Sequence, residues 1–337
     1  MDVLGMALDP GINIAVQQIS PVLMLIAPPG EVLDSTPWYL ILIAVLFLGF
    51  HPRHGLRLAV LIGLTAGLNE ALKLAWHLPR PYWISSQVIA FSGHSSFGFP
   101  SGAAMYGAAA YGYIASVVRR WWVVVVCLIL LVSTCFVRII GGVHFLPDVL
   151  GGLLFGFVLL ILFLVTEARI AAYFRRLSRS GRWIGMILLS SIPIVLVIPA
   201  YASVAGWELP ASWAETAFLQ TGQMIDPVAI RYAWGGAGII LGSLAGYEVL
   251  MAQGGWEPPE GFWQKCLVIV FGTGSTLAVW AITIVVRAVG DLPDPLGSAV
   301  SICSMAVVLF WLTCCVPLVA RKYGFARMEI RPEPGSS

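Results

Sequence analysis

The sequence predicts an all-α integral membrane protein, a multi-helix bundle with about nine membrane-spanning segments. Of the 337 residues, 59% are hydrophobic and only 11% are charged, whereas a soluble domain carries about 25% charged residues. The apolar residues are gathered in long runs. The basic residues lie unevenly around those runs, as in proteins whose loops face different sides of a membrane. These three observations define the fold class.

A membrane-spanning helix requires about 20 mostly apolar residues. The segments that meet this requirement are residues 34–50, 56–76, 103–118, 121–140, 149–166, 183–203, 234–252, 263–286 and 295–319. The first and third are short, which predicts tilted or extended helices. The apolar stretch 10–28 is broken by Pro21 and by the Gln17-Gln18 pair, which favours a helix lying in the membrane interface.

The arginines and lysines predict an orientation for these spans. With the spans alternating in direction, 14 of the 19 basic residues fall on the side opposite the N-terminus. The positive-inside rule identifies that side as the cytoplasm, so the C-terminus is predicted to be cytoplasmic. The basic residues that remain on the extracytoplasmic side are Lys73, Arg80, Arg138, Arg231 and Arg287.

The spans and loops divide the chain into parts of different character. The expected parts are an N-terminal interfacial segment (1–33), a membrane core (34–166), a basic cytoplasmic loop (167–182), additional transmembrane helices of unassigned role (183–320) and a cytoplasmic tail (321–337). The net charge of +2 does not favour a nucleic-acid partner. All six cysteines lie in apolar runs, which predicts buried apolar side chains and neither a disulfide framework nor a metal site.

Three motifs are predicted to meet on the extracytoplasmic side, each at the end or the start of a span. They are Lys73-x6-Arg80-Pro81, Pro100-Ser101-Gly102 and Arg138-x5-His144-x3-Asp148. A lysine supplies a point charge, and arginines supply planar forks that match phosphoryl oxygens. The free backbone N–H groups where the third span begins favour an anion, and Gly102 lets it approach the backbone closely. The motifs therefore predict a phosphate site.

The third motif also predicts a nucleophile. Pro147 suits the first helical position, which places His144 in the turn before the fifth span and Asp148 in its first turn. Asp148 can then accept a hydrogen bond from one imidazole nitrogen and leave the other nitrogen free to attack.

The joint spacing of the motifs resembles the signature of the type 2 phosphatidic acid phosphatase superfamily over about residues 56–166, and is most similar to bacterial membrane members. The resemblance implies that 34–166 is a phosphatase-like core with an extracytoplasmic site. It implies that His144 attacks phosphorus and forms a phosphohistidine, that Asp148 orients His144, and that water releases phosphate with no metal and no cofactor. The phosphate ligands that it implies are Lys73, Arg80, Ser101, Gly102 and Arg138.

Two residues depart from the family pattern. Val137 stands where a serine commonly precedes the arginine of the third motif, which removes one hydrogen bond. Ala103 stands where the second motif ends in the histidine that protonates the leaving oxygen, and alanine cannot transfer a proton. The chain is therefore expected to be inactive or strongly impaired. It is either a natural variant that lost or rerouted the acid or a deliberately disabled sequence, and the intact remainder of the site favours a deliberate His-to-Ala change.

Other polar residues near the motifs have simpler interpretations. Ser92-Gly93-His94 looks like a displaced second motif, but no proline precedes it and it lies in a loop, so His94 is predicted to be a loop residue with no proton-transfer role. His77 is predicted to be a spacer. Glu70, one helical turn before Lys73, is expected to pair with that lysine. Glu248 has no obvious partner, and either lines a substrate pocket or lies near the membrane interface.

The leading hypothesis is a membrane lipid phosphatase that hydrolyses a lipid phosphate or diphosphate ester, in a bacterial inner membrane with its site on the periplasmic side. Its expected partners are a phosphorylated lipid substrate and membrane lipids. The sequence does not choose among phosphatidic acid, phosphatidylglycerol phosphate, a sphingoid phosphate and a polyprenyl diphosphate, and it does not determine the oligomeric state. The alternatives are a non-catalytic lipid-phosphate binder or transporter and a lipid phosphotransferase.

Overall fold

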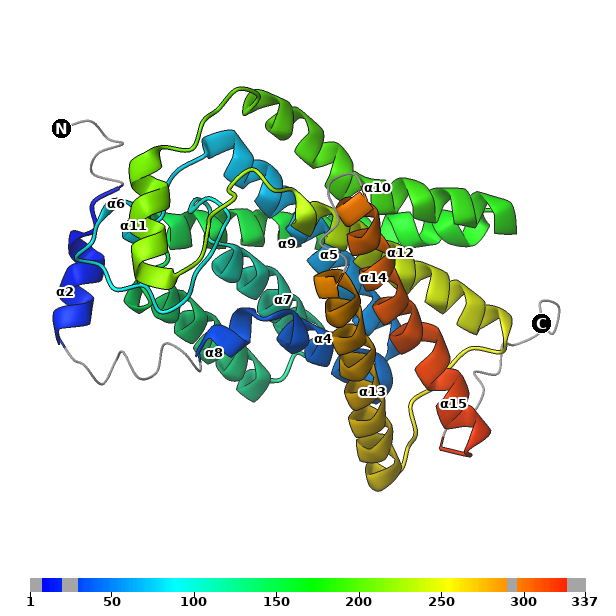
Figure 1. Cartoon of the computed structure of the whole chain (residues 1–337). Coiled ribbons are helices and arrows are strands. Elements are labelled where there is room, and N and C mark those ends of the chain that lie inside the picture. The colour runs from blue at the N-terminus through cyan, green and yellow to red at the C-terminus, as the bar shows by residue number, and fades with distance from the viewer. Residues whose placement is uncertain (1–7, 20–29, 290–295, 326–337) are drawn as a thin grey trace. The chain divides into compact units, whose positions relative to one another are not determined.

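The computed structural model describes residues 8–19, 30–289 and 296–325, and the regular structure of these residues is entirely helical (Figure 1). The predicted all-α class is therefore confirmed. The helices in chain order are α2 (Gly11–Ile19), η1 (Glu31–Asp34), α4 (Thr36–Ala44), η2 (Val45–Phe50), α5 (Pro52–Trp76), α6 (Pro81–Ile84), α7 (Gly102–Val118), α8 (Trp121–Ile140), α9 (Leu146–Arg176), α10 (Arg179–Ser203), α11 (Ala211–Thr221), α12 (Arg231–Ala252), α13 (Phe262–Val289), α14 (Leu296–Phe310), η3 (Trp311–Cys315) and α15 (Val316–Lys322).

Within the described residues, the predicted spans lie on these helices, and only the first contains a bend, at Ser35 between η1 and α4. Among the described residues, seven helical segments are long and apolar enough to cross a membrane. The first and third predicted spans are the shorter ones, Thr36–Phe50 and the 17-residue α7. A helix of that length extends about 26 Å at 1.5 Å per residue, less than the roughly 30 Å hydrocarbon core of a bilayer. The count of nine spans stays a prediction.

The basic segment 167–182, expected to be a loop, is mostly helical. α9 continues to Arg176 and α10 begins at Arg179, so the connection between the two helices is very short. The reason lies in composition, because residues 167–176 contain no glycine or proline and are rich in alanine and arginine, which favour helix.

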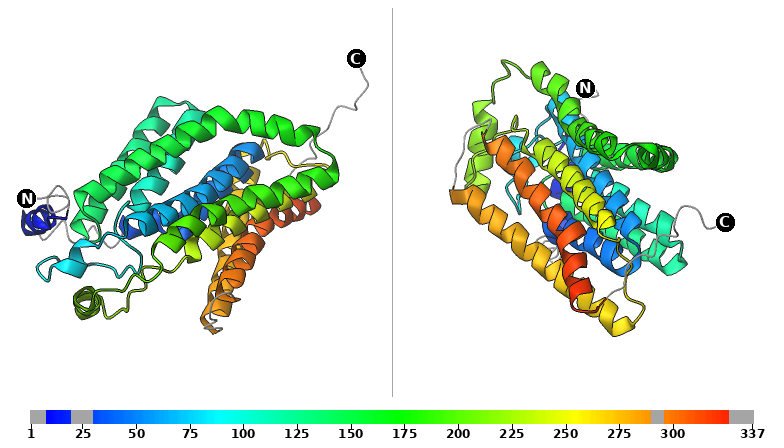
Figure 2. Two further views of the ribbon diagram at one scale, coloured as in Figure 1. Left: turned by 90° about the horizontal axis from the view of Figure 1, so that it is seen from above. Right: turned by 90° about the vertical axis from the view of Figure 1, so that its right-hand side faces the viewer.

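The chain forms two compact units. Unit 1 comprises residues 1–35, 65–169 and 194–233, and unit 2 comprises residues 36–64, 170–193 and 234–337. All of the predicted site residues belong to unit 1. In unit 2, α13 packs against α14, and Figures 1 and 2 show α13 and the α14–η3–α15 rod as neighbours that run in opposite directions.

Aromatic side chains form much of the core of unit 1. Trp83 and Phe97 are fully buried, and both come from the segment that links α5 to α7. The ring of Trp207 lies 5.1 Å from that of Phe97, and the ring of Trp213 lies 6.1 Å from that of Trp83. The chain around α11 therefore covers the α5–α7 segment and holds it in place.

Local sequence explains where the helices near the predicted site begin and end. Pro81 occupies the first turn of α6, and Ser101 is the N-cap of α7. α8 ends before Gly141 and Gly142, and Gly142 has a φ of +68°, a conformation that glycine adopts without strain. The resulting turn leads from α8 into α9 and carries His144.

Candidate active site

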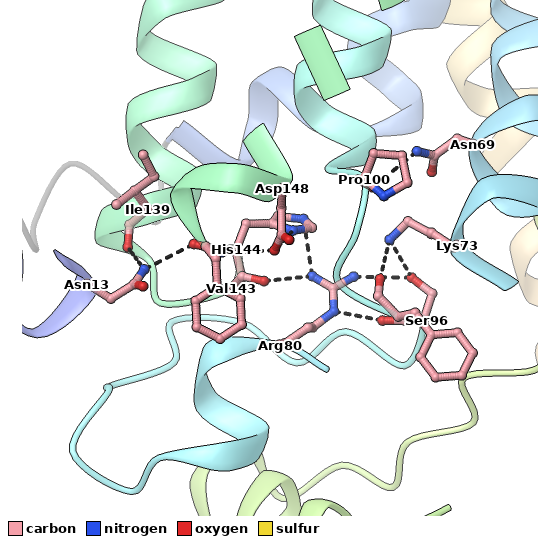
Figure 3. A network of polar contacts seen from close by, with 12 residues as sticks. Asn13, Asn69, Lys73, Arg80, Ser96, Pro100, Ile139, Val143, His144 and Asp148 are labelled. Carbon is pink, nitrogen blue, oxygen red and sulfur yellow. Dashed lines mark hydrogen bonds and ion pairs between the residues drawn. The ribbon is translucent and has the colours of Figure 1, made fainter. Parts of the chain in front are cut away.

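The three motifs converge in unit 1, at neighbouring ends of four helices (Figure 3). The side chains involved are all buried. They are Lys73 in the last turn of α5, Arg80 before α6, Ser101 at the start of α7, Arg138 in the last turn of α8, His144 in the turn that follows, and Asp148 in the first turn of α9. Lys73, Arg80, Ser101, Gly102 and Arg138 together form the cradle.

His144 lies between a carboxylate and a guanidinium. Its Nδ1 is 3.3 Å from Asp148 Oδ2, which also accepts a hydrogen bond of 2.9 Å from the backbone N–H of Phe145. Its Nε2 is 3.2 Å from Arg80 Nη1. Because arginine is only a donor, Nε2 is the acceptor in this contact, and the ring proton lies on Nδ1, facing Asp148. The nitrogen that bears the free lone pair thus points toward the cradle.

The environment of His144 keeps its imidazole neutral. Burial, and then the charges of Arg80 and Lys73, hold the pKa of His144 well below its ordinary value. A neutral ring is the form that can act as a nucleophile or a hydrogen-bond acceptor, so the electrostatics of the site agree with the tautomer that the contacts indicate.

Two of the cradle cations are held by the loop before α7. Arg80 donates from Nε to the carbonyl oxygen of Ser96 at 2.7 Å, and from Nη2 to Ser96 Oγ at 3.1 Å. Lys73 donates from Nζ to Ser96 Oγ at 3.1 Å and to the carbonyl oxygen of Phe97. Ser96 belongs to no motif, so no sequence pattern points to it.

Arg138 and Ser101 of the cradle have hydrogen-bond donors that lack acceptors. Among the described residues, Arg138 Nε, Arg138 Nη2 and Ser101 Oγ are buried and have no hydrogen-bond partner. An unmade hydrogen bond of a buried donor costs about 1–3 kcal/mol. These donors lie at the end of one helix and the start of another, beside the histidine, where an anion with several oxygens would satisfy them together.

The backbone of the second motif, at the start of α7, lies against Asn69 of α5. Asn69 of α5 donates from Nδ2 to the carbonyl oxygen of Pro100 at 3.3 Å. A Cβ atom on residue 102 would lie 3.1 Å from Asn69 Oδ1, so glycine allows this close approach. Ala103 is buried in the first turn, and only 1% of its surface is exposed.

An acidic pair that the sequence analysis missed lies against the cradle. The short helix η1 packs against both α7 and α8. Its Glu31 Oε1 lies 3.2 Å from Arg138 Nη1, and its Asp34 Oδ2 lies 3.7 Å from the same atom. Burial raises the pKa of Asp34, and Arg138 opposes this effect. Because η1 lies about a hundred residues from Arg138 in the chain, no local pattern could have revealed the contact.

The N-terminal helix α2 also reaches the site. Asn13 donates from Nδ2 to the carbonyl oxygens of Ile139 at 2.8 Å and His144 at 3.0 Å. Gln17, one turn later, donates to the carbonyl oxygen of Ile140 at 2.7 Å. Both side chains are buried, and α2 packs against α8. The sequence pattern of this stretch predicts only an interfacial helix; residues 20–29 lie outside the described part.

Two carboxylates have partners other than those expected. Glu70 accepts hydrogen bonds from the backbone N–H groups of Tyr232 and Ala233, so it caps the start of α12, and no direct pair with Lys73 is present within the described residues. A carboxylate at a helix start is favoured by the helix dipole. Glu248 pairs with Arg182, with Oε1 at 2.7 Å from Nη2 and 2.9 Å from Nε.

The fold and the site define a class of protein: a helical membrane protein with a buried cluster of basic side chains next to a histidine. Residues 54–172 match the PAP2 superfamily, as the motif spacing predicted. The match suggests phosphatase-type activity, and every predicted site residue lies within the matched range. No curated protein and no solved structure matches the chain.

Proposed function

We propose that the protein is a membrane lipid phosphatase that hydrolyses a lipid phosphate or diphosphate ester through a phosphohistidine intermediate. The observation that carries the proposal is the set of buried, unpartnered donors on Arg138 and Ser101 beside a neutral His144. A phosphoryl group supplies the acceptor oxygens that these donors lack. It also supplies the electrophile that an oriented imidazole can attack.

The proposed first step follows from the contacts. A phosphoryl group that enters the cradle takes the place of His144 in its contact with Arg80, and His144 Nε2 attacks phosphorus. Asp148 holds Nδ1–H and stabilises the positive charge that the ring acquires on attack. The cradle cations stabilise the charge on the phosphoryl oxygens in the transition state. Water then cleaves the phosphorus–nitrogen bond, and phosphate leaves.

Two features support a lipid as the substrate. The cradle lies at the ends of α5, α8 and α9, which are long and apolar enough to cross a bilayer, so a phosphate there would be at headgroup depth. The asymmetry of basic residues favours the extracytoplasmic side for this end, with a cytoplasmic C-terminus. We therefore place the proposed reaction on the periplasmic side of a bacterial inner membrane.

The proposal is tested by anion binding. Sulfate or tungstate should raise the melting temperature of the purified protein in detergent, because either dianion satisfies the buried donors of the cradle. Arg138→Ala should abolish this stabilisation. Arg231→Ala removes an arginine that the charge pattern places on the same side but outside the cradle, and should leave the stabilisation unchanged. Equal stabilisation of the unmodified protein and Arg138→Ala would contradict a phosphate site.

A second candidate function is a non-catalytic lipid-phosphate binder, and Ala103 is the observation that favours it. A binder needs the cradle but no proton donor. Single-turnover assays with a radiolabelled lipid diphosphate distinguish the two functions, because a phosphatase labels His144 and releases phosphate, whereas a binder does neither.

A further inference from the structure

The proposed phosphatase reaction needs a proton donor for the leaving oxygen, and Ala103 cannot provide one. We propose that His94 is this general acid. The inference rests on the proposed function and adds a second catalytic histidine to it. It also replaces the expectation that His94 is a loop residue without a role in proton transfer.

The backbone of His94 is anchored beside the cradle. The hydroxyl of Tyr82 donates to the carbonyl oxygen of His94 at 3.0 Å and accepts from its N–H at 2.9 Å. Tyr82 is fully buried and lies two residues after Arg80. Two residues after His94, Ser96 accepts hydrogen bonds from both Arg80 and Lys73. The loop that carries the imidazole is therefore fixed to the cations that would hold the substrate.

The ring of His94 is separated from Arg138 by a single carboxylate. His94 Nε2 lies 3.8 Å from Glu31 Oε2, and the other oxygen, Oε1, lies 3.2 Å from Arg138 Nη1. A phosphoryl group is similar to a carboxylate in its oxygen spacing, so an ester in place of Glu31 could contact both groups. Ser92 Oγ, at 3.0 Å from the same Nε2, orients the ring. About a quarter of the imidazole is exposed, which leaves room for a leaving group.

The charges around His94 let a bound substrate favour its protonated form, with the proton coming from solvent. The groups that face the ring are Glu31 of η1, Lys73 of α5, Arg80, Arg138 of α8 and His144. Burial, and then Arg80, Arg138 and Lys73, hold the pKa of His94 well below its ordinary value. A bound phosphate dianion offsets these cations and favours the charged imidazolium. His94 therefore becomes protonated when an ester binds and is neutral before that.

Each step of the proposed reaction then balances. His144 Nε2 forms a bond to phosphorus, the bond between phosphorus and the lipid oxygen breaks, and its electron pair goes to that oxygen. The imidazolium of His94 gives its proton to the same oxygen, so the lipid leaves as a neutral alcohol. Neutral His94 next accepts a proton from the water that attacks the phosphohistidine, and inorganic phosphate leaves as the phosphorus–nitrogen bond breaks.

The test uses the dependence of the rate on the leaving group. His94→Ala should lower the hydrolysis of a dialkylglycerol monophosphate, whose alkoxide leaves poorly, by about 10²–10⁴-fold. It should lower the hydrolysis of a polyprenyl diphosphate much less, because phosphate is a weak base and leaves without a proton. His94→Gln, which keeps a polar side chain of similar size, should behave as His94→Ala does. His77→Asn, which changes an exposed histidine of the same segment, should affect neither substrate.

A rescue variant separates catalysis from loop structure. Adding Ala103→His to His94→Ala should restore monophosphate hydrolysis at least in part, because it returns an imidazole to the start of α7. A loop damaged by His94→Ala would not be repaired in this way. If His94→Ala slows both substrates equally, or slows neither, the acid is not His94, whereas the phosphatase function stands wherever hydrolysis is seen. If neither the unmodified chain nor Ala103→His hydrolyses any substrate yet both bind sulfate, both proposals fall.

Proton uptake provides a second measurement that does not need turnover. Sulfate stays a dianion near neutral pH, so any proton taken up when it binds is taken from the buffer and goes onto a group of the protein. Calorimetry in buffers of different ionisation enthalpy should show net proton uptake at pH 7 in the unmodified protein. The uptake should be lost in His94→Ala and retained in His144→Ala. Uptake that persists in His94→Ala, or no uptake at all, would overturn the proposal.

Discussion

At the scale of single residues, burial gives ordinary side chains the properties that the proposed phosphate site requires. A buried arginine is stable only if its donors find acceptors, and among the described residues Arg138 leaves two nitrogens without one. His144 is likewise kept neutral by burial and by its cationic neighbours. Asp148 completes the arrangement because it selects which imidazole nitrogen carries the proton. Each of these effects depends on the low polarity of the surroundings, which a residue pattern alone does not measure.

Asp148→Asn tests the role of the carboxylate charge. Asp148 Oδ2 contacts both His144 Nδ1 and the N–H of Phe145, so an asparagine oxygen in its place can keep both contacts but lacks the negative charge that stabilises the imidazolium formed on attack. We expect hydrolysis of a lipid diphosphate to fall about 10²–10⁴-fold, while sulfate still stabilises the protein as it does the unmodified chain. A variant that loses sulfate binding to the same extent as activity would instead place Asp148 in the cradle.

At the scale of elements, the site is assembled from helix ends that are distant in the chain. The cradle and the histidine come from α5, α7 and α8, from the residue before α6 and from the turn between α8 and α9, and their placement relies on close packing. Gly152 of α9 lies so near the carbonyl oxygen of Ser101 that a Cβ atom would overlap it, and a Cβ atom on Gly156 would lie 2.6 Å from the carbonyl oxygen of Met105. Small residues at helix interfaces are a common device of membrane proteins. Here they bring Asp148 next to the start of α7.

Helix α2 supports the site in a different way, because its side chains donate to backbone carbonyl oxygens and do not contact the side chains that are proposed to react. Asn13→Ala and Gln17→Ala would each remove buried hydrogen bonds to the turn that carries His144. We expect each to reduce the rate of His144 phosphorylation about 10–10²-fold through misplacement of the ring, with little change in sulfate affinity.

Gln18→Ala is the matched control for α2, because Gln18 is exposed on the same helix. It should leave the phosphorylation rate unchanged. If Gln17→Ala and Gln18→Ala behave alike, α2 does not position the histidine. Single-turnover phosphorylation and sulfate titration on the same preparations separate positioning from binding.

At the scale of the whole molecule, the distribution of charge predicts which side of the membrane each end of the helices faces. The connection between α9 and α10 is flanked by arginines, whereas the cradle lies at the opposite end of α9. The charges of the cradle, which oppose the positive-inside rule, are buried and have partners or a proposed ligand. The rule therefore applies to the exposed basic residues, and these favour an extracytoplasmic site.

Thiol labelling tests this orientation. The native cysteines would be replaced, and Ser86→Cys or Ser180→Cys introduced, because both serines are exposed and lie toward opposite ends of the predicted spans. An impermeant maleimide should label the cysteine at position 86 in intact cells. It should label the cysteine at position 180 only after permeabilisation. The reverse pattern would place the site in the cytoplasm.

The sequence by itself determined the membrane class, the helical fold and the phosphatase motifs, because these depend on composition, on the length of apolar runs and on local spacing. The residues of the three motifs lie together in the structure, and their role in binding phosphate stays a proposal. Only the tertiary structure brought Glu31, Asn13, Ser96 and His94 to that site, because these contacts join segments far apart in the chain or depend on how a loop folds. It also gave Glu70 and Glu248 their partners. Long-range contacts leave no periodicity and no fixed spacing, so packing alone decides them.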